Sequence, residues 1–407
     1  MNSLNQFRQL TGQSTYAENL THLFNAAIKE NIPIAIWRKP AEEQIQAICQ
    51  ISDRKLQIEE LENAPEGFIF HPFRKPEGES RNYILSEIEL SQKKNEFVIH
   101  PTLQNHSTEL SAFFHVFKEL QSDDKFKFTD FLHSSPEVDE DKDKFISLVE
   151  KCKQYISEGY YQKIVPSRRA KYGIKKNFHP VHELFKLCEA YENAFVSLVY
   201  MPGNGLWIGA TPELLISTEN NQYFHTVSLA GTQGVPPDFD LSRAAWRHKE
   251  IEEQALVSRY IVNCFKQIRL REYDENGPKT VKAGNLIHLK TSFKVDMKAT
   301  NFPELASTML QLLHPTSAIC GMPMKPAAQF LEQNEGYDRE YFSGYLGPVN
   351  FESSTSIFVN LRCSRVYRDG GVIYAGAGVT EYSIAEDEWA ETEIKFRTLL
   401  NVFESNA

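Results

Sequence analysis

Short strand-like runs follow one another closely through the middle of this 407-residue chain. They lie at 161–169, 195–200, 205–210, 213–217 and 223–229. Strands at this density exclude an all-helical protein. The elements predicted after them are helices at 242–272, 303–313 and 386–403, and strands at 344–351, 355–366 and 371–377. Strand runs with hairpin spacing, separated by long helices, predict an α+β fold and not a regular βαβ sheet.

The first 135 residues contain strand-like runs at 32–38, 67–73 and 95–101 but no catalytic pattern. A polar stretch at 134–144 then leads into an amphipathic helix that begins near Phe145. This stretch is either a boundary or a solvated loop inside one domain. With 41% hydrophobic residues, the chain can bury a large core as one large domain or as two ordinary ones.

Charge and composition argue against several classes of binding partner and site. The formal net charge of −10 and a pI near 5.7 argue against a general nucleic-acid surface, which requires a basic face. No stretch approaches the length of a membrane span, and the N-terminus shows no secretory signal pattern. The six cysteines lie far apart and indicate neither a zinc site nor a disulfide framework. We therefore expect a cytoplasmic protein with reduced cysteines and no membrane contact.

The run from 372 to 395 joins a glycine-interrupted strand to a helix. Glu388, Glu391 and Lys395 fall within one helical arc, and Gly376 and Gly378 just upstream permit close approach to the backbone. Two carboxylates and one ammonium facing a bare glycine loop suit a metal-bound organic acid. The alternative is that Glu391 and Lys395 form an ordinary solvated i,i+4 pair.

Two single residues earlier in the chain could exchange protons. Lys163 lies in a strand-like run, where an inward lysine would be desolvated and could act as a base; an outward lysine would only meet solvent. Pro166 predicts that this strand is at an edge or bulged. Glu213 precedes an apolar run, where burial would raise its pKa and allow it to donate a proton; an exposed turn glutamate is the alternative.

Further polar groups could bind an anion or a cation. The turn around Gly231 and Thr232 offers backbone N–H groups and a hydroxyl to a carboxylate. Glu253 can face inward from its helix and then needs a cation, for which Mg²⁺ shared with Glu391 is the expected choice. An acidic first turn that complements the helix dipole is the alternative. Arg362 lies inside a strand-like run, and its planar guanidinium group could bind a carboxylate through two hydrogen bonds.

Taken in order, the segments resemble blocks of the chorismate-utilising enzymes, which include isochorismate, anthranilate, aminodeoxychorismate and salicylate synthases. The blocks are Lys-Ile-Val-Pro-Ser-Arg, Thr-Pro-Glu-Leu-Leu, Leu-Ala-Gly-Thr, Glu-Glu-Gln-Ala-Leu-Val, Ile-His-Leu, Leu-His-Pro-Thr-Ser-Ala, Tyr-Asp-Arg-Glu, Leu-Arg-Cys, Ala-Gly-Ala-Gly-Val and Glu-Trp-Ala-Glu-Thr. The resemblance covers about 155–403. It implies a large layered β-sheet core with surrounding helices, as in anthranilate synthase component I. Residues 1–135 would be a divergent part of the same fold and 136–407 the chorismate-binding catalytic region, in one structural domain overall.

The likeness within this family is to the isochorismate synthases. Its water-activating members have lysine at the position of Lys163, where ammonia-using members have glutamine, and its isomerases resemble this chain at Ala318, where lyases have threonine. The resemblance implies that Lys163 deprotonates water for attack at C2 of chorismate while Glu213 protonates the departing C4 hydroxyl. It also implies Mg²⁺ held by Glu253 and Glu391, with Glu388 nearby. The substrate-binding residues that it implies are Gly231, Thr232, His288, Ala318, Arg362, Gly376, Gly378 and Lys395.

Some positions depart from the family's usual pattern, notably Gln233 and Gln254, where the family has a basic residue and histidine. The predicted enzyme needs no amidotransferase subunit and would be a monomer or weak homodimer. Its product would serve menaquinone or catechol siderophore biosynthesis. A salicylate synthase that also expels pyruvate, and a chorismate-binding protein without turnover, are the alternatives.

Overall fold

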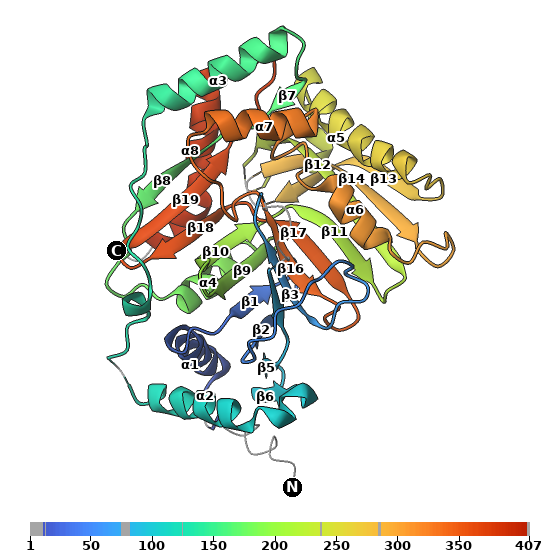
Figure 1. Ribbon diagram of the computed structural model, residues 1–407. Coiled ribbons are helices and arrows are strands. Elements are labelled where there is room, and N and C mark those ends of the chain that lie inside the picture. The colour runs from blue at the N-terminus through green and yellow to red at the C-terminus, as the bar shows by residue number, and fades with distance from the viewer. Residues whose placement is uncertain are drawn as a thin grey trace.

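The computed structural model describes residues 11–404, apart from 13, 75–81, 124, 237 and 284–285. Across these residues the chain forms two large antiparallel sheets (Figure 1), and the predicted α+β fold is confirmed. The nine-stranded sheet has the order β6 (Glu96–Ile99), β5 (Ile88–Ser91), β2 (Ile45–Cys49), β1 (Ile34–Arg38), β9 (Phe195–Met201), β10 (Gly205–Thr211), β18 (Cys363–Tyr367), β19 (Gly370–Gly376) and β8 (Ser167–Tyr172).

The eight-stranded sheet packs against the first. Its order is β13 (Asp274–Ala283), β14 (Leu286–Asp296), β12 (Tyr223–Gly234), β11 (Leu214–Glu219), β17 (Thr355–Val359), β16 (Tyr345–Val349), β3 (Gly67–His71) and β4 (Asn82–Leu85). A small third sheet pairs β7 (Lys163–Ile164) with β15 (Gly321–Met322). The first 135 residues therefore supply strands to both large sheets: β1 pairs with β9, and β3 pairs with β16.

Aromatic side chains fill the space between the two large sheets. Trp37, Phe195 and Trp207 come from the nine-stranded sheet and meet Phe68 and Phe358 of the eight-stranded sheet in one buried cluster. The rings of Phe195 and Phe358 stack with centroids 4.2 Å apart. Because each strand turns alternate side chains to opposite faces, the outer faces of both sheets are also apolar and need cover.

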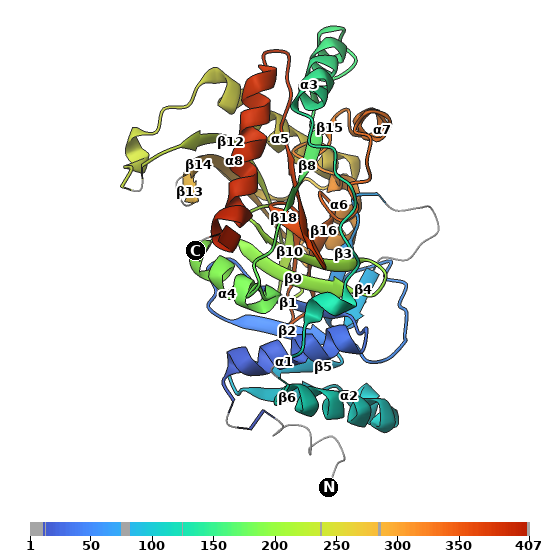
Figure 2. The ribbon, with the colours of Figure 1, turned by 90° about the vertical axis from the view of Figure 1, so that its left-hand side faces the viewer.

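Helices provide this cover on both outer faces (Figure 2). The nine-stranded sheet shares an apolar core with α1 (Tyr16–Lys29), α2 (Ser107–Leu120), α4 (Pro180–Ala190) and α8 (Ala385–Glu404). The eight-stranded sheet shares one with α3 (Lys142–Ser157), α5 (His248–Gln267), α6 (Leu305–Leu313) and α7 (Met324–Asn334). Short 3₁₀ turns lie at η2 (Pro101–Asn105), η3 (Phe128–Phe131) and η4 (Leu241–Arg243). None of the described helices combines the length and apolarity needed to cross a membrane.

Three predicted elements differ from the observed ones. The strand expected at 161–169 is interrupted at Pro166, which has no N–H for a ladder bond, so β7 and β8 belong to different sheets. The strand expected at 355–366 likewise divides into β17 and β18. The helix expected at 242–272 begins only at His248, because the Glu250 carboxylate accepts the N–H of Arg247 at 2.8 Å and caps it there.

Candidate active site

The chain passes from one large sheet to the other at two neighbouring points. Glu213 lies in the link between β10 and β11, and Arg362 lies in the link between β17 and β18. The Val359 N–H donates to the carbonyl oxygen of Glu213 at 2.9 Å, and the Ala210 N–H donates to that of Arg362 at 3.0 Å. These bonds place an acid and a cation together where the two sheets meet.

Arg362 is held in an unusual backbone conformation. Its φ of 49° lies in the left-handed region, which residues with a side chain seldom occupy and which often marks functional sites. The side chain is half-buried, and none of the described residues forms a hydrogen bond or ion pair with its guanidinium group. Desolvation lowers the pKa of Arg362, while Glu391 and Glu213 oppose that shift. The guanidinium thus remains available to an anionic ligand.

Glu213 has the protonation behaviour of a general acid. Desolvation raises the pKa of its carboxyl group from 4.5 to about 7, and the positive charges of Lys163, Arg362 and Lys395 limit the increase. A carboxyl group with this pKa is partly protonated near neutral pH and can donate that proton. The sequence-based expectation of a raised pKa therefore has a physical cause in the structure.

Lys163 comes from the small third sheet, where it pairs with Met322 of β15. Its half-buried side chain lies against the glycine loop that follows β19: a Cβ atom placed on Gly378 would lie 2.9 Å from Lys163 Cε and 3.2 Å from Nζ. Its charge acts on Glu213, Glu391 and Lys395. The base expected from the sequence and the glycine loop are thus neighbours.

Lys395 extends from α8 toward the end of β19. Its Nζ donates to the carbonyl oxygen of Gly376 at 2.6 Å and lies 2.5 Å from Glu391 Oε1. Desolvation lowers the pKa of Lys395, and Glu391 opposes this. Desolvation would raise the pKa of Glu391, but Lys395 and Arg362 hold it below its ordinary value. Glu391, with a side chain 48% exposed, is therefore an accessible, ionised carboxylate.

The three predicted metal ligands do not form a cluster. No group of three His, Cys, Asp or Glu side chains in the described residues is arranged to hold a metal ion. Glu388 is buried at 4% exposure in the first turn of α8. Glu253 on α5 is half-buried and has no hydrogen bond or ion pair among the described residues. Carboxylates such as those of Glu253 and Glu391 are of the donor type that Mg²⁺ takes, one or two at a time, with further oxygens from a ligand.

The turn predicted around Gly231 and Thr232 is wrong: both residues lie within β12, at a β-bulge that packs against α5. Gly231 sits at the bulge with φ of 66°, and a Cβ there would lie 2.9 Å from Glu250 Cβ. His288 pairs across from Thr232, whose side chain lies outside the described part of the structure. Desolvation lowers the pKa of His288 to about 4, with a contribution from Arg362, while a hydrogen bond to the Gly231 backbone opposes the shift. His288 is therefore neutral near pH 7.

Gln254, one of the positions that depart from the family's usual pattern, is held by several hydrogen bonds next to Glu253. Its amide Nε2 donates to Ser228 Oγ at 2.7 Å and to Thr291 Oγ1 at 2.9 Å, and its Oε1 accepts the Ala230 N–H at 3.0 Å. This buried side chain ties α5 to β12 and β14. Both the amide nitrogen and the amide oxygen of Gln254 therefore have hydrogen-bond partners.

A cavity opens beside these groups. The residues that line it are Val165, Ala318, Ile319, Arg339, Phe342, Ser343, Leu361, Arg362, Tyr374, Ala375, Gly376 and Lys395. Ala318, Arg362, Gly376 and Lys395 were predicted from the sequence to bind substrate. Arg339, Phe342, Ser343 and Tyr374 were not, although the Tyr-Asp-Arg-Glu block could have drawn attention to Arg339. The lining residues combine apolar walls with the cationic side chains of Arg339, Arg362 and Lys395, whereas Lys163 and Glu213 are not among them.

Known proteins share this sequence pattern. A family model described as "Chorismate binding enzyme" matches residues 4–404. Isochorismate synthase EntC of Escherichia coli (strain K12) is 32% identical over 210 residues, which cover 50% of this chain and 53% of that protein. Isochorismate synthase DhbC of Bacillus subtilis (strain 168) is 32% identical over 199 residues, covering 47% and 49%. The chain spans about half the length of these curated relatives.

Solved structures share the fold over a longer range. The menaquinone-specific isochorismate synthase MenF from Escherichia coli aligns with a TM-score of 0.73 at 20% identity, covering 91% of this chain and 88% of that one. Anthranilate synthase component I from Streptococcus pneumoniae TIGR4 aligns with a TM-score of 0.65 at 20% identity, covering 90% and 89%. Because the family model matches nearly the whole sequence, the chain belongs to the chorismate binding enzyme family.

Proposed function

We propose that the protein is an isochorismate synthase, a Mg²⁺-dependent isomerase that adds water at C2 of chorismate as the C4 hydroxyl leaves. The observation that carries this proposal is Glu213: a carboxyl group with a pKa near 7, in the field of Lys163, Arg362 and Lys395. The sequence similarity to isochorismate synthases, over about half the chain, supports the same reaction.

Substrate recognition follows from charge. Chorismate carries two carboxylates, and a chain with a net charge of −10 needs local cations to bind it. The guanidinium of Arg362, which has no hydrogen bond or ion pair to any described residue, would receive one carboxylate in a two-point contact. Glu253 and Glu391 would hold Mg²⁺ against the other, where the metal would neutralise charge when bound. Phe342 and Tyr374, which line the cavity, would provide apolar contacts to the ring of chorismate.

The proposed reaction requires one proton donor and one proton acceptor. Lys163 accepts a proton from the attacking water, whose oxygen bonds to C2; the ring double bonds shift, and the C4–O bond breaks. Protonated Glu213 gives its proton to the departing hydroxyl, which leaves as water. Lys163 ends protonated and Glu213 ionised, and transfer of one proton from the lysine to the carboxylate restores the starting state.

Lys163 and Ala318 favour addition of water to chorismate without amination and without loss of pyruvate. Lysine at 163 suits activation of water and not of ammonia, so the proposed enzyme requires no amidotransferase subunit. Ala318 lines the cavity at the position where the family's lyases have threonine, which argues against pyruvate loss. Whether the isochorismate would enter menaquinone or catechol siderophore biosynthesis depends on neighbouring enzymes.

The decisive experiment is an incubation of the purified protein with chorismate and Mg²⁺, with and without EDTA, followed by HPLC. We expect isochorismate alone, lost with EDTA and in Lys163→Ala and Glu213→Gln. Lys171→Ala, which removes an exposed lysine from β8, is the matched control and should keep full activity. Salicylate with pyruvate would place the protein among the salicylate synthases, and chorismate binding without turnover would identify a binding protein.

A further inference from the structure

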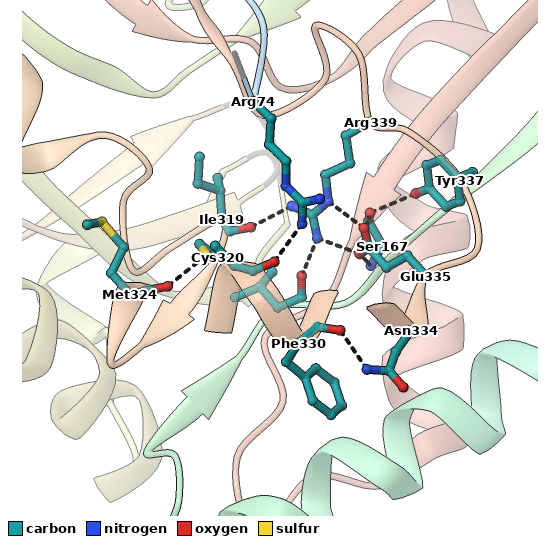
Figure 3. A network of polar contacts seen from close by, with 12 residues as sticks. Arg74, Ser167, Ile319, Cys320, Met324, Phe330, Asn334, Glu335, Tyr337 and Arg339 are labelled. Carbon is teal, nitrogen blue, oxygen red and sulfur yellow. Dashed lines mark hydrogen bonds and ion pairs between the residues drawn. The ribbon is translucent and has the colours of Figure 1, made fainter. Parts of the chain in front are cut away.

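A buried arginine joins the segment that carries Lys163 to the loop that carries Ala318. Figure 3 shows the Arg339 guanidinium between the two segments. Its Nη2 donates to the Val165 carbonyl and its Nη1 to the Ile319 carbonyl, each at 2.7 Å. Val165 is two residues from Lys163, and Ile319 is next to Ala318. One side chain therefore holds the backbone on two sides of the cavity.

Glu335, at the C-terminal end of α7, fixes this arginine. Glu335 Oε2 accepts from Arg339 Nε at 2.8 Å and Oε1 from Nη2 at 2.5 Å. The same Oε1 also accepts the Ser167 N–H at 2.7 Å and the Ser167 hydroxyl at 2.9 Å. The side chains of the pair are only 2% and 3% exposed. A buried, bidentate pair with its lone pairs satisfied has little freedom to move.

The Arg339–Glu335 pair, called the clamp below, acts where the strand segment that carries Lys163 reaches Pro166. Its backbone ladder with the segment of β15 includes bonds from Gln162 N to Met322 O at 2.8 Å and from Val165 N to Cys320 O at 2.9 Å. Pro166 then offers no N–H to continue the ladder. At that point the Arg339 guanidinium donates to the Val165 carbonyl, while the Pro166 carbonyl accepts the Ala377 N–H at 3.0 Å, so a side chain and a backbone bond together hold the end of the segment.

The two arginines that line the cavity, Arg339 and Arg362, differ in how far their guanidinium groups are already bonded to the protein. Arg339 directs four hydrogen bonds at the protein itself, and its charge is neutralised by Glu335. Arg362 has no hydrogen bond or ion pair to its guanidinium among the described residues. A carboxylate of the ligand would therefore gain much more from Arg362, because binding to Arg339 would have to compete with an existing buried ion pair.

We propose that Arg339, fixed by Glu335, is a positioning residue: it sets the distance between Lys163 and the Ala318 loop without contacting the substrate. The inference rests on the proposed function, since it assigns Lys163 the role of base. A lysine displaced by a fraction of an ångström to 1 Å would lose much of its rate, because proton transfer depends steeply on geometry. Arg339 should consequently affect kcat much more than KM.

The test compares Arg339→Lys with wild type by steady-state kinetics, thermal unfolding and hydrogen–deuterium exchange. Lysine keeps the charge but cannot bridge both carbonyls as the planar guanidinium does. We expect kcat per folded molecule to fall at least tenfold with KM within about twofold. Amides of the peptide 160–167 should exchange about tenfold faster, because the ladder loses its closing bonds.

Arg74→Met is the matched control. Arg74 lies beside Arg339 in Figure 3, but it donates to the Ala328 carbonyl at 2.5 Å and pairs with Glu332; among the described residues it makes no hydrogen bond to Val165 or Ile319. It should leave kcat and the exchange of peptide 160–167 unchanged. If Arg339→Lys does not fold, Glu335→Gln, which keeps the shape of the partner, should show the same pattern with a several-fold fall in kcat.

Three outcomes would overturn the proposal. An unchanged kcat with a lower melting temperature would make the pair merely structural, and a KM raised tenfold at constant kcat would place Arg339 on the substrate. Unchanged exchange in 160–167 would show that the arginine does not hold the segment. Wild-type protein without isochorismate formation would instead refute the proposed function, and the exchange measurement would still test the clamp.

Discussion

Lys395 Nζ donates a 2.6 Å hydrogen bond to the carbonyl oxygen of Gly376 and thereby joins α8 to the end of β19. The same ammonium group pairs with Glu391, four residues earlier on the helix. One cation thus connects the glycine loop, the cavity wall and an ionised carboxylate. Because Lys395 is anchored at two points, the charge that it presents to a ligand has a fixed position, as pre-organised binding requires.

The raised pKa of Glu213 predicts how activity depends on pH. The acid must be protonated to assist departure of the C4 hydroxyl, and its pKa in the free enzyme is about 7. We therefore expect kcat/KM for chorismate to fall tenfold per pH unit well above pH 7. Glu213→Gln should lower kcat by about 10²–10⁴-fold and abolish this limb. A profile that stays level from pH 6 to 9 in wild type would contradict the assignment.

The same group predicts a pH-dependent difference in stability. The pKa of Glu213 is about 7 in the folded protein and 4.5 without burial, so the folded state binds this proton more tightly. Its favourable contribution is complete below pH 4.5 and is lost as pH rises through 7. Relative to wild type, Glu213→Gln should gain free energy of unfolding between pH 5 and 8, on the order of 3 kcal/mol.

Urea unfolding at several pH values, without ligand, measures this difference. Glu192→Gln, which changes an exposed glutamate, is the control and should follow wild type throughout. A constant difference between Glu213→Gln and wild type from pH 5 to 8 would show that the Glu213 carboxyl group is not desolvated in the free protein.

Arg362→Lys tests the anion site. Lysine keeps the positive charge but loses the planar fork that receives a carboxylate in two hydrogen bonds. We expect KM for chorismate to rise about 10–100-fold, equivalent to the loss of roughly 1.4–2.7 kcal/mol of binding. Arg365→Lys is the control, since Arg365 lies three residues further along and is paired with Glu340. An unchanged KM in Arg362→Lys would exclude a two-point contact at this residue.

Much of the fold could be predicted from local sequence, and the failures have physical causes. Strands such as β9, with only one residue that is not fully buried, appear as apolar runs. The hairpin of β13 and β14 was missed because β13 is largely polar and has no apolar run to mark it. The division of 355–366 depends on Arg362 adopting a left-handed conformation, which no residue pattern announces.

The candidate active site, too, could be predicted only in part from the sequence. The residue types of Lys163, Glu213, Arg362 and Lys395, read with the family resemblance, could be singled out from the sequence. Their mutual arrangement could not, because it depends on two crossovers between sheets. Arg339 was missed because its significance lies in bonds to the carbonyl oxygens of residues 174 and 20 positions away. Contacts of that kind are set by tertiary structure and leave no periodic signal.

Gly378→Ala would test the position of Lys163 with a single methyl group. The φ of Gly378 lies outside the left-handed region, so the backbone can accept alanine without strain. The new Cβ would lie 2.9 Å from Lys163 Cε and 3.2 Å from Nζ, closer than atoms normally approach, and the flexible lysine must move aside. We therefore expect kcat to fall at least tenfold while the melting temperature changes little.

Gly173→Ala provides the matched control, because that glycine is exposed and a Cβ there would meet no atom within 4 Å. It should leave both kcat and melting temperature unchanged. If Gly378→Ala retains wild-type kcat, the ammonium group does not need the position seen against the glycine loop, and Lys163 would have to act from another rotamer. If both activity and stability fall together, the methyl group displaces the backbone and not the lysine alone.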